Sequence, residues 1–186
     1  EETKDEQKRR FQAFIEANAR GILQSIEYGA GTASVQDSYG ELVERVHQAK
    51  ALEFLPERRG EVDLYLWNGI GDASEELKEE ARKIVKGYYA EDGTPIYGYK
   101  AGGIILNVYT APIRYVTIKL EITLDRWSTP AEVEELVERT VDLHFARLRM
   151  GTELVQTELE AEIKFLEGVY DVKLYLSTDD GETYTT

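Results

Sequence analysis

The sequence predicts an α+β fold: two small α/β sandwich-like modules, each a short sheet covered by one or two helices, after an N-terminal helical segment. Apolar residues alternate at period two in several short segments, which is typical of strands with one buried face. In other segments they recur every three or four residues, as on an amphipathic helix. Glycine and proline turns separate the two kinds of segment. We therefore predict a helical segment at 1–30, a first α+β domain at 31–111 and a second at 112–186.

The N-terminal part is predicted to contain two helices. The first spans residues 3–20, with a modest apolar stripe of Phe11, Phe14, Ile15 and Ala19. Gly21 interrupts it, a short helix follows at Ile22–Tyr28, and residues 29–31 are expected to form a loop. From 32 to 56 we predict strands on both sides of a turn at Ser38-Tyr39-Gly40, although a helical spacing also fits Leu42, Val46 and Ala49.

The middle of the chain has the pattern of a βαβ-like unit. A strand that ends at the turn dipeptide Asn68-Gly69 is indicated by the alternating residues Val62, Leu64 and Leu66. Asp72, with Glu75 three residues later, is the expected N-cap of a helix. The apolar face of this helix contains Leu77, Ala81, Ile84, Val85 and Tyr88. After a turn at 92–95, a second strand is indicated by Ile104, Leu106 and Val108.

The segment after the expected boundary at Pro112 begins with the most regular alternation in the chain. Residues 116–124 predict a strand with one buried face and one exposed face. Thr129 and Glu132 then have the spacing of a capping box, with Pro130 at the first helical position. The helix that follows has one apolar stripe, made of Val133, Leu136, Val137, Val141, Phe145 and Leu148.

The stretch from Met150 to Leu176 predicts a turn, a helix and a strand, and it contains no nucleophile, metal cluster or phosphate loop. Thr157 and Glu160 are expected to form a second capping box. The inward face of the helix consists of Leu159, Ile163 and Leu166. Gly168 is the expected C′ residue, because glycine enters the left-handed region at little cost. The last strand has the alternating residues Val172, Leu174 and Leu176, and the polar tail 177–186 is expected to fray.

Composition excludes several classes of function. The chain has 22 basic and 36 acidic residues, and a net charge of −14 repels phosphate backbones and anionic lipid. We therefore expect neither nucleic acid nor membrane as a partner, and no apolar run approaches the roughly 18–20 residues of a membrane span. Because the chain has no cysteine, disulfides, thiolate metal sites and cysteine nucleophiles are excluded.

A turn at Gly69–Ser74 is the strongest candidate for chemistry. It follows a predicted strand and opens a predicted helix, as a dinucleotide-binding fingerprint does, and its glycines would let a pyrophosphate approach the helix N-terminus. However, Ser74 stands at the third glycine position, Asp72 would place a carboxylate beside the phosphates, and too few strands follow. A nucleotide-binding or small enzymatic domain that uses Gly69, Gly71 and Ser74 is the alternative to a simple strand–turn–helix corner.

The other titratable residues do not form a predicted site. His47 has no local partner for nucleophilic catalysis, and His144 lies on an apolar helical stripe, where a packed, hydrogen-bonded histidine is expected. Two carboxylate pairs at helical spacing, Glu134/Glu138 and Glu158/Glu162, lie on polar faces that do not give the members of a pair different environments. The segment 179–182 lacks the full spacing of a calcium loop and predicts a β-turn. We therefore predict no enzymatic activity and no catalytic, cofactor-binding or metal-binding residue.

Tyrosines flank the predicted turn at 92–95, at Tyr88-Tyr89 and Tyr97-Gly98-Tyr99. Stacking platforms for nucleic acid lie in basic grooves, whereas the neighbours here are Glu91 and Asp92. A protein contact surface is the functional interpretation, because tyrosine is enriched at such surfaces. The alternative is that these tyrosines pack between the two halves of the chain.

Several segments together resemble the baseplate J-like family, the wedge proteins of contractile phage tails and related injection machines. GEVDLYLWNGIG (60–71), followed by an amphipathic helix, is similar to the middle domain of that family, and GYYAEDGTPIYGYKAGGIILNVYTA (87–111) to its crossover into the next strand. HFARLRMGTELVQTELEAEIKFLEGVYDVKLYL (144–176) resembles its C-terminal signature. The resemblance covers roughly residues 8–176. Family members usually have a further N-terminal region, so the chain is expected to be a C-terminal portion or a shortened relative.

The resemblance implies a structural, non-enzymatic protein of the virion tail baseplate or of a phage-tail-like particle, assembled in the host cytoplasm. The implied partners are copies of the chain itself and other baseplate wedge, hub or sheath proteins. The implied role is to pass a conformational change toward sheath contraction. A generic adaptor module unrelated to tails is a further alternative.

Overall fold

The computed structural model describes residues 4, 7, 8, 10, 11, 22–179 and 183. The chain divides into two compact units, Glu1–Pro112 and Ile113–Thr186, each with its own hydrophobic core. The described residues combine helices with several small sheets, so the predicted α+β class is confirmed. The predicted helix at 3–20 and most of the polar tail lie outside the described residues. The limits of the three parts, 1–30, 31–111 and 112–186, remain a prediction.

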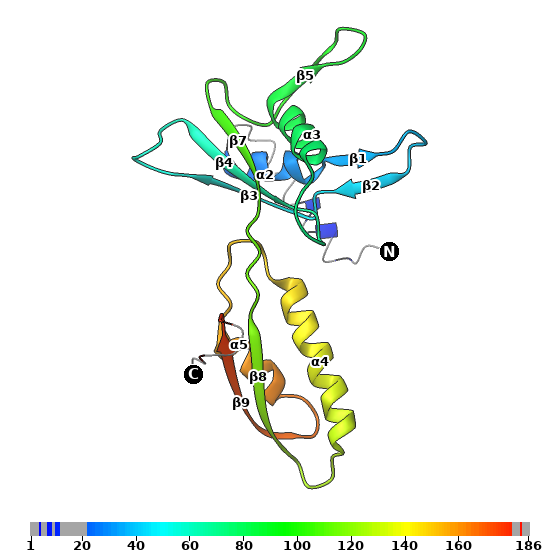
Figure 1. Cartoon of the computed structure of the whole chain (residues 1–186), viewed down its shortest axis with the longest axis vertical. Coiled ribbons are helices and arrows are strands. Elements are labelled where there is room, and N and C mark those ends of the chain that lie inside the picture. Colours follow the sequence, from blue (N-terminus) through cyan, green and yellow to red (C-terminus); the bar gives the residue numbers. More distant parts are fainter. Residues whose placement is uncertain (1–3, 5–6, 9, 12–21, 180–182, 184–186) are drawn as a thin grey trace. The chain divides into compact units, whose positions relative to one another are not determined.

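The first unit contains a three-stranded sheet with β4 at its centre (Figure 1). Its elements are α2 (Leu23–Gly31), β1 (Ser34–Gln36), β2 (Leu42–Arg45), β3 (Gln48–Glu53), β4 (Glu61–Trp67), α3 (Glu75–Lys86), β5 (Gly87–Tyr89), β6 (Pro95–Tyr97) and β7 (Ile105–Thr110). β3 pairs with β4 in the antiparallel sense, whereas β7 is parallel to β4. Because α3 lies between these parallel strands in the chain, the predicted βαβ-like unit is confirmed.

Helices α2 and α3 pack on one face of this sheet. The core between them contains Ile26 and Ala30 of α2, Leu77, Ala81 and Val85 of α3, and Val62, Leu64 and Leu66 of β4. Since successive side chains of a strand point to opposite faces, Asp63, Tyr65 and Trp67 lie on the other face of β4. This other face of β4 carries a buried polar cluster around Asp63.

Two predicted boundaries in this unit are wrong. The expected loop at 29–31 is the last turn of α2, and the ring of Tyr99 lies where a β-carbon on Gly29 would be, so packing holds these small residues in the helix. The expected N-cap Asp72 lies outside α3. The N-cap is Ser74, whose Oγ accepts a hydrogen bond from the Leu77 amide at 3.1 Å.

The predicted strands on both sides of Ser38-Tyr39-Gly40 are confirmed as the hairpin β1–β2. Asp37 closes its turn, since Oδ1 accepts hydrogen bonds from the amides of Tyr39 and Glu41. A second hairpin, β5–β6, was not predicted, although its turn at 92–95 was. The antiparallel pairs of this hairpin are Gly87↔Tyr97, Tyr88↔Ile96 and Tyr89↔Pro95.

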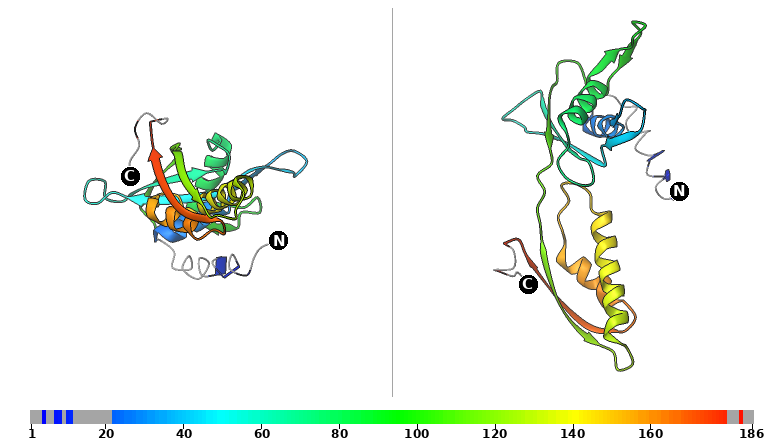
Figure 2. Two further views of the ribbon diagram at one scale, coloured as in Figure 1. Left: turned by 90° about the horizontal axis from the view of Figure 1, so that it is seen from below. Right: turned by 45° about the vertical axis from the view of Figure 1, so that its right-hand side comes forward.

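The second unit is a two-stranded sheet with two helices on one face (Figures 1 and 2). Its elements are β8 (Thr117–Leu124), α4 (Pro130–Arg147), α5 (Gln156–Lys164) and β9 (Val169–Ser177). β8 and β9 are antiparallel, and the predicted alternation of β8 is confirmed, because its apolar residues contact the core and its polar residues are exposed. The buried core consists of Val133, Val137, Leu159, Ile163, Val169, Val172 and Leu174.

Helix α4 begins where the sequence predicts, with Thr129 at the N-cap and Pro130 at the first position, but the capping box does not form. The Thr129 hydroxyl donates to the Glu132 carboxylate at 2.5 Å and caps no amide. The predicted apolar stripe is also partly wrong. Leu136 and Phe145 leave 38% and 36% of their surface exposed, and His144 is buried instead. The buried residues of α4 are Val133 and Val137, which lie in the core, and His144, which faces Glu162 of α5.

Helix α5 has no capping box either. It begins at Gln156, one residue before Thr157, and its N-cap is Val155, which has no side chain that can cap. The predicted inward residues are confirmed, since Leu159 and Ile163 are fully buried and Leu166 packs against the core. Gly168 has the predicted positive φ, +90°, but it lies in the turn before β9, beyond the C′ position. A β-carbon there would approach Ser128 Oγ to 2.7 Å, so close packing also requires glycine.

Candidate functional site

The corner at Gly69–Ser74 lies between β4 and α3, and it is already occupied by a carboxylate of the chain. Glu44, on β2, accepts hydrogen bonds from Asn68 Nδ2 at 2.7 Å, from the Ser74 amide at 3.2 Å and from the Ser74 hydroxyl. Asn68 Oδ1 accepts from the amides of Ile70 and Gly71 at 2.9 and 2.8 Å. Glu44 thus takes the position at the helix N-terminus that a phosphate would need.

Replacement of Glu44 by glutamine is expected to reduce the free energy of unfolding by about 1–3 kcal/mol at neutral pH, because three donors lose a charged acceptor. Partial burial acts to raise the pKa of Glu44, but the hydrogen bonds from Ser74 and Asn68 outweigh it and the net shift is downward. A lowered folded-state pKa stabilises the protein above the unfolded value of about 4.5, and this stabilisation is lost as the pH falls through the folded pKa.

Urea denaturation of the wild type and Glu44→Gln at pH 7 and at pH 3 measures this effect. The difference in free energy of unfolding between the wild type and Glu44→Gln should be smaller at pH 3 than at pH 7. A difference that is the same at both pH values would contradict the assigned role of the carboxylate. Glu57→Gln is the control, since Glu57 is exposed in the β3–β4 loop.

The two histidines lie in different units, and each packs within its own unit. The ring of His47 packs edge-on against Trp67, with centroids 5.1 Å apart. His144 is buried between α4 and α5, and its Nδ1 lies 3.2 Å from Glu162 Oε2. Its Nε2 is buried without a hydrogen-bond partner among the described residues. His144 is therefore a packed histidine that joins two helices.

The predicted carboxylate pairs differ in their surroundings. Glu158 is exposed, whereas Glu162 contacts His144 and lies 3.8 Å from Arg147 Nη1, so it is not simply solvated. Glu134 and Glu138 are exposed at the mouth of a groove between α4 and β8. Asp179 accepts hydrogen bonds from Ser177 and Thr183, which lower the pKa of its carboxyl group to about 2; residues 180–182 lie outside the described part.

A polar cluster that sequence reasoning missed lies on the face of β4 opposite the helices. Asp63 is only 4% exposed and forms an ion pair with Arg58, and Asn107 Nδ2 donates to its Oδ1 at 3.0 Å. The hydrogen bond from Arg58 is the main reason that the pKa of Asp63 is lowered. Asp63 and Asn107 are neighbours in the parallel register of β4 and β7, so strand pairing explains their contact. The cluster is a fully paired structural element of the sheet.

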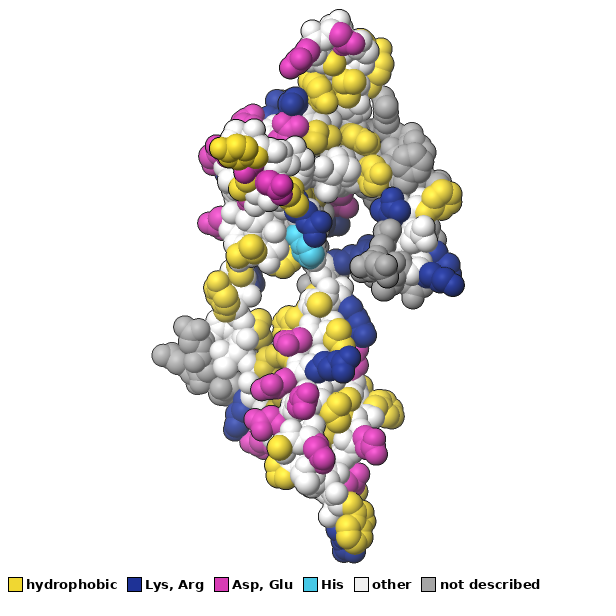
Figure 3. Space-filling view, turned by 90° about the vertical axis from the view of Figure 1, so that its right-hand side faces the viewer, with side chains coloured by type: hydrophobic (Ala, Val, Ile, Leu, Met, Phe, Trp, Pro, Cys, Tyr) yellow, Lys and Arg dark blue, Asp and Glu magenta, His cyan; other side chains and the backbone are white. Residues whose placement is uncertain are grey.

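The β5–β6 hairpin is the strongest candidate for a contact surface. Tyr89, Pro95 and Tyr97 share one face of the hairpin, because paired residues and residues two apart point the same way. Tyr89 and Tyr97 leave 78% and 71% of their surface exposed. The space-filling view shows hydrophobic side chains beside acidic ones at this end of the unit (Figure 3). The acidic residues of the tip are Glu91 and Asp92.

The base of this hairpin is held against the end of α3. The amides of Tyr99 and Lys100 both donate to the carbonyl oxygen of Val85, at 2.9 and 3.1 Å. Gly98 lies so close to Val85, Lys86 and Gly87 that no β-carbon fits there. Two of the predicted contact tyrosines lie elsewhere. Tyr99 packs edge-on against Tyr28 inside the first unit, and Tyr88 lies on the other face of the hairpin with Lys83 Nζ 4.7 Å from its ring centroid. The hairpin therefore leaves α3 at a fixed angle (Figure 2).

The described residues offer few sites for other chemistry. Among them, no three histidine, aspartate or glutamate side chains are grouped so that they could hold a metal ion. None of the helices in the described part combines the length and the apolar composition of a membrane span. That the chain has no catalytic, cofactor-binding or metal-binding residue stays a prediction.

Comparison with protein families gives a match at residues 116–184, to the baseplate J-like protein C-terminal domain. The second unit therefore resembles the C-terminal domain of baseplate J-like proteins. The matched residues include β8, α4, α5 and β9, which are the sheet and helix pair described above. No curated protein matches the chain.

The matched domain supports a structural role in a phage tail baseplate, and the baseplate J-like family is generally not enzymatic. The match includes the whole C-terminal signature at 144–176 that carries the sequence resemblance, and that part of the prediction is confirmed. The first unit lies outside the matched residues. Its resemblance to the middle domain of baseplate J-like proteins remains a prediction.

Proposed function

We propose that the chain is a wedge subunit of a contractile-tail baseplate. It assembles with copies of itself and with neighbouring wedge, hub or sheath proteins, and it relays the conformational change that leads to sheath contraction. The observation that carries this proposal is the baseplate J-like C-terminal domain at 116–184. In this role the protein works in the virion tail or a tail-like particle after assembly in the host cytoplasm, without catalysis, cofactor, nucleic acid or membrane.

The β5–β6 hairpin supports the proposal as a contact for a neighbouring protein. Its exposed aromatic face combines large apolar area with hydroxyl groups, which is typical of residues that dominate binding at interfaces. The glycine-rich base and the bonds to Val85 fix its direction relative to α3. A rigid protrusion loses little conformational entropy on binding, so it suits a subunit that assembles in a fixed geometry.

Replacement of Tyr89 and Tyr97 by serine is expected to weaken binding to neighbouring tail proteins by at least about tenfold, because two aromatic anchors are lost. Pull-down with the proteins encoded beside this chain measures the effect. The matched control replaces Tyr39 and Tyr170 by serine, since these tyrosines are also exposed, at 90% and 70%, but lie outside the hairpin. Equal recovery with both double variants would contradict the hairpin as the contact.

The self-association of the wild-type chain is tested separately by light scattering over a range of concentrations. The proposal predicts a mass that rises with concentration, or stable complexes with neighbouring tail proteins. A strict monomer at every concentration that also recovers no tail protein would contradict the wedge role. Calorimetry with ATP and NAD tests the alternative, and we expect no heat of binding because Glu44 occupies the corner.

A further inference from the structure

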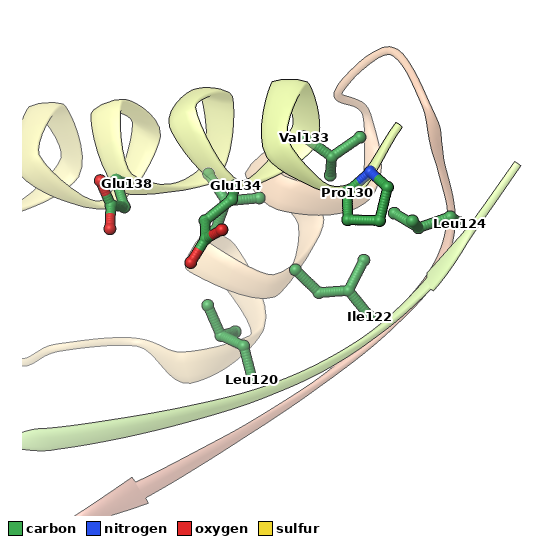
Figure 4. Close-up of a pocket in the computed structure, with 8 residues that line it drawn as sticks. Leu120, Ile122, Leu124, Pro130, Val133, Glu134 and Glu138 are labelled. Atoms are coloured by element: carbon green, nitrogen blue, oxygen red, sulfur yellow. The ribbon is translucent and has the colours of Figure 1, made fainter. Parts of the chain in front are cut away.

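A groove in the second unit runs between β8 and α4, with a volume of about 400 Å³ (Figure 4). Its apolar lining consists of Leu120, Ile122 and Leu124 from β8 and Pro130, Val133 and Val137 from α4. Leu120 and Ile122 rise from the strand toward the helix, and Glu134 and Glu138 project from the helix at the mouth (Figure 4). The groove is thus apolar inside and acidic at its rim.

The sheet next to this groove is incomplete. Within the described residues β8 pairs only with β9, so its other edge presents backbone N–H and C=O groups to no strand. Leu120, Ile122 and Leu124 are only partly buried, although they point toward α4. A two-stranded sheet is marginally stable alone, and a third strand on β8 would cover these side chains and satisfy the edge.

The charges at the rim indicate the chemistry of the occupant. Glu134 and Glu138 lie one helical turn apart, a like-charge arrangement that destabilises a helix. No ion pair joins either carboxylate to a described residue. A lysine or arginine on an extended segment in the groove would neutralise them. The chain itself carries −14, and its β5–β6 hairpin has Glu91 and Asp92 at the tip, so a second copy fits the rim poorly.

We propose that the groove binds an extended segment of another protein, which adds to β8 as a third strand. One row of its side chains is apolar and covers Leu120 and Ile122, and its lysine or arginine residues contact Glu134 and Glu138. Main-chain hydrogen bonds to β8 supply affinity, and the alternating side chains supply specificity. That the donor is a baseplate protein rests on the proposed function, whereas the strand addition itself follows from the groove.

The test uses the full chain and short overlapping peptides that tile the proteins encoded beside it, with binding measured by fluorescence anisotropy. Peptides that alternate apolar with basic residues should bind. The double variant Glu134→Lys, Glu138→Lys should weaken their binding at least about tenfold, because attraction becomes repulsion. The matched control, Glu135→Lys with Asp142→Lys, makes the same change of charge at exposed positions of α4 outside the groove lining and should bind as the wild type does.

Strand addition is distinguished from simple charge attraction by peptides methylated on alternate backbone nitrogens. Methylation of the nitrogens whose N–H groups point toward β8 should abolish binding. Methylation of the nitrogens between them should leave binding unchanged. The proposal is overturned if no peptide that alternates apolar with basic residues binds. It is also overturned if both charge variants lose binding equally, or if methylation of neither set of nitrogens affects binding. So would occupation of the groove by a second copy, seen as dimerisation that only the groove variant breaks. If the chain is found in tail particles but binds no peptide, the proposed strand addition is overturned and the baseplate role is not.

Discussion

Replacement of Leu159 by alanine is expected to unfold much of the second unit while the first unit stays folded. Leu159 is fully buried at the centre of the small core between α4, α5 and the sheet. Removal of a buried leucine side chain costs about 2–5 kcal/mol, from lost transfer free energy and the cavity that remains. A unit of the size of Ile113–Thr186 has a total stability of roughly 4–11 kcal/mol, so this loss is a large fraction of it.

Amide hydrogen exchange separates the two units in this experiment. Amides of β8 and β9 should lose most of their protection in the Leu159→Ala variant, and amides of β4 should keep theirs, because β4 belongs to the other core. Leu136→Ala is the control, since this leucine of α4 is 38% exposed and its truncation should have little effect. An equal loss of protection in β4 and β9 would show one cooperative core and contradict the division at Pro112.

Replacement of Gly98 by alanine is expected to displace the β5–β6 hairpin and to lower the free energy of unfolding of the first unit by about 3 kcal/mol, the upper range for overpacking. The added β-carbon would meet the Val85 carbonyl oxygen and the backbone of Lys86 and Gly87, none of which can rotate away as a side chain can. The hydrogen bonds from Tyr99 and Lys100 to that carbonyl would break as the chain moves.

Denaturation and tyrosine fluorescence measure this effect. Gly102→Ala is the matched control, because a β-carbon at Gly102 meets no atom of the described residues. The Gly98→Ala variant should also lose binding to neighbouring tail proteins, as the hairpin no longer keeps its direction. A Gly98→Ala variant that is as stable as Gly102→Ala would contradict the close packing at the base of the hairpin.

The sequence predicts most of the regular elements because their hydrophobic periods are undisturbed. β8 alternates along its whole length, β4 does so at Val62, Leu64 and Leu66, and β9 does so at Val172, Leu174 and Leu176. The helical spacing of Leu77, Ala81 and Val85 gives α3 its buried face. The three predicted N-terminal caps fail in different ways. At α3 a tertiary contact overrides the local pattern, because Glu44 comes from β2 to the corner and Ser74 becomes the cap. At α4 the Thr129 hydroxyl donates to Glu132 and caps no amide, and α5 begins one residue before Thr157.

Features that depend on pairing between distant segments could not be predicted. The buried state of Asp63 follows from its register opposite Asn107 and from Arg58 in the β3–β4 loop, neither of which a period reveals. The partial exposure of Leu136 and Phe145 on α4 follows from how this helix packs on its core, whereas the packed state of His144 was predicted from its place on the apolar stripe. The acidic groove between α4 and β8 likewise appears only when both elements are placed in space.

The composition of purified tail particles tests the central claim most directly. Particles are isolated from cells that express this chain, stripped of loosely bound protein with high salt, and analysed by quantitative mass spectrometry. The account predicts that the chain is retained in a fixed ratio to the other baseplate proteins, as a structural subunit must be. A chain that is abundant in the cells but absent from intact particles would contradict its assignment as a baseplate component.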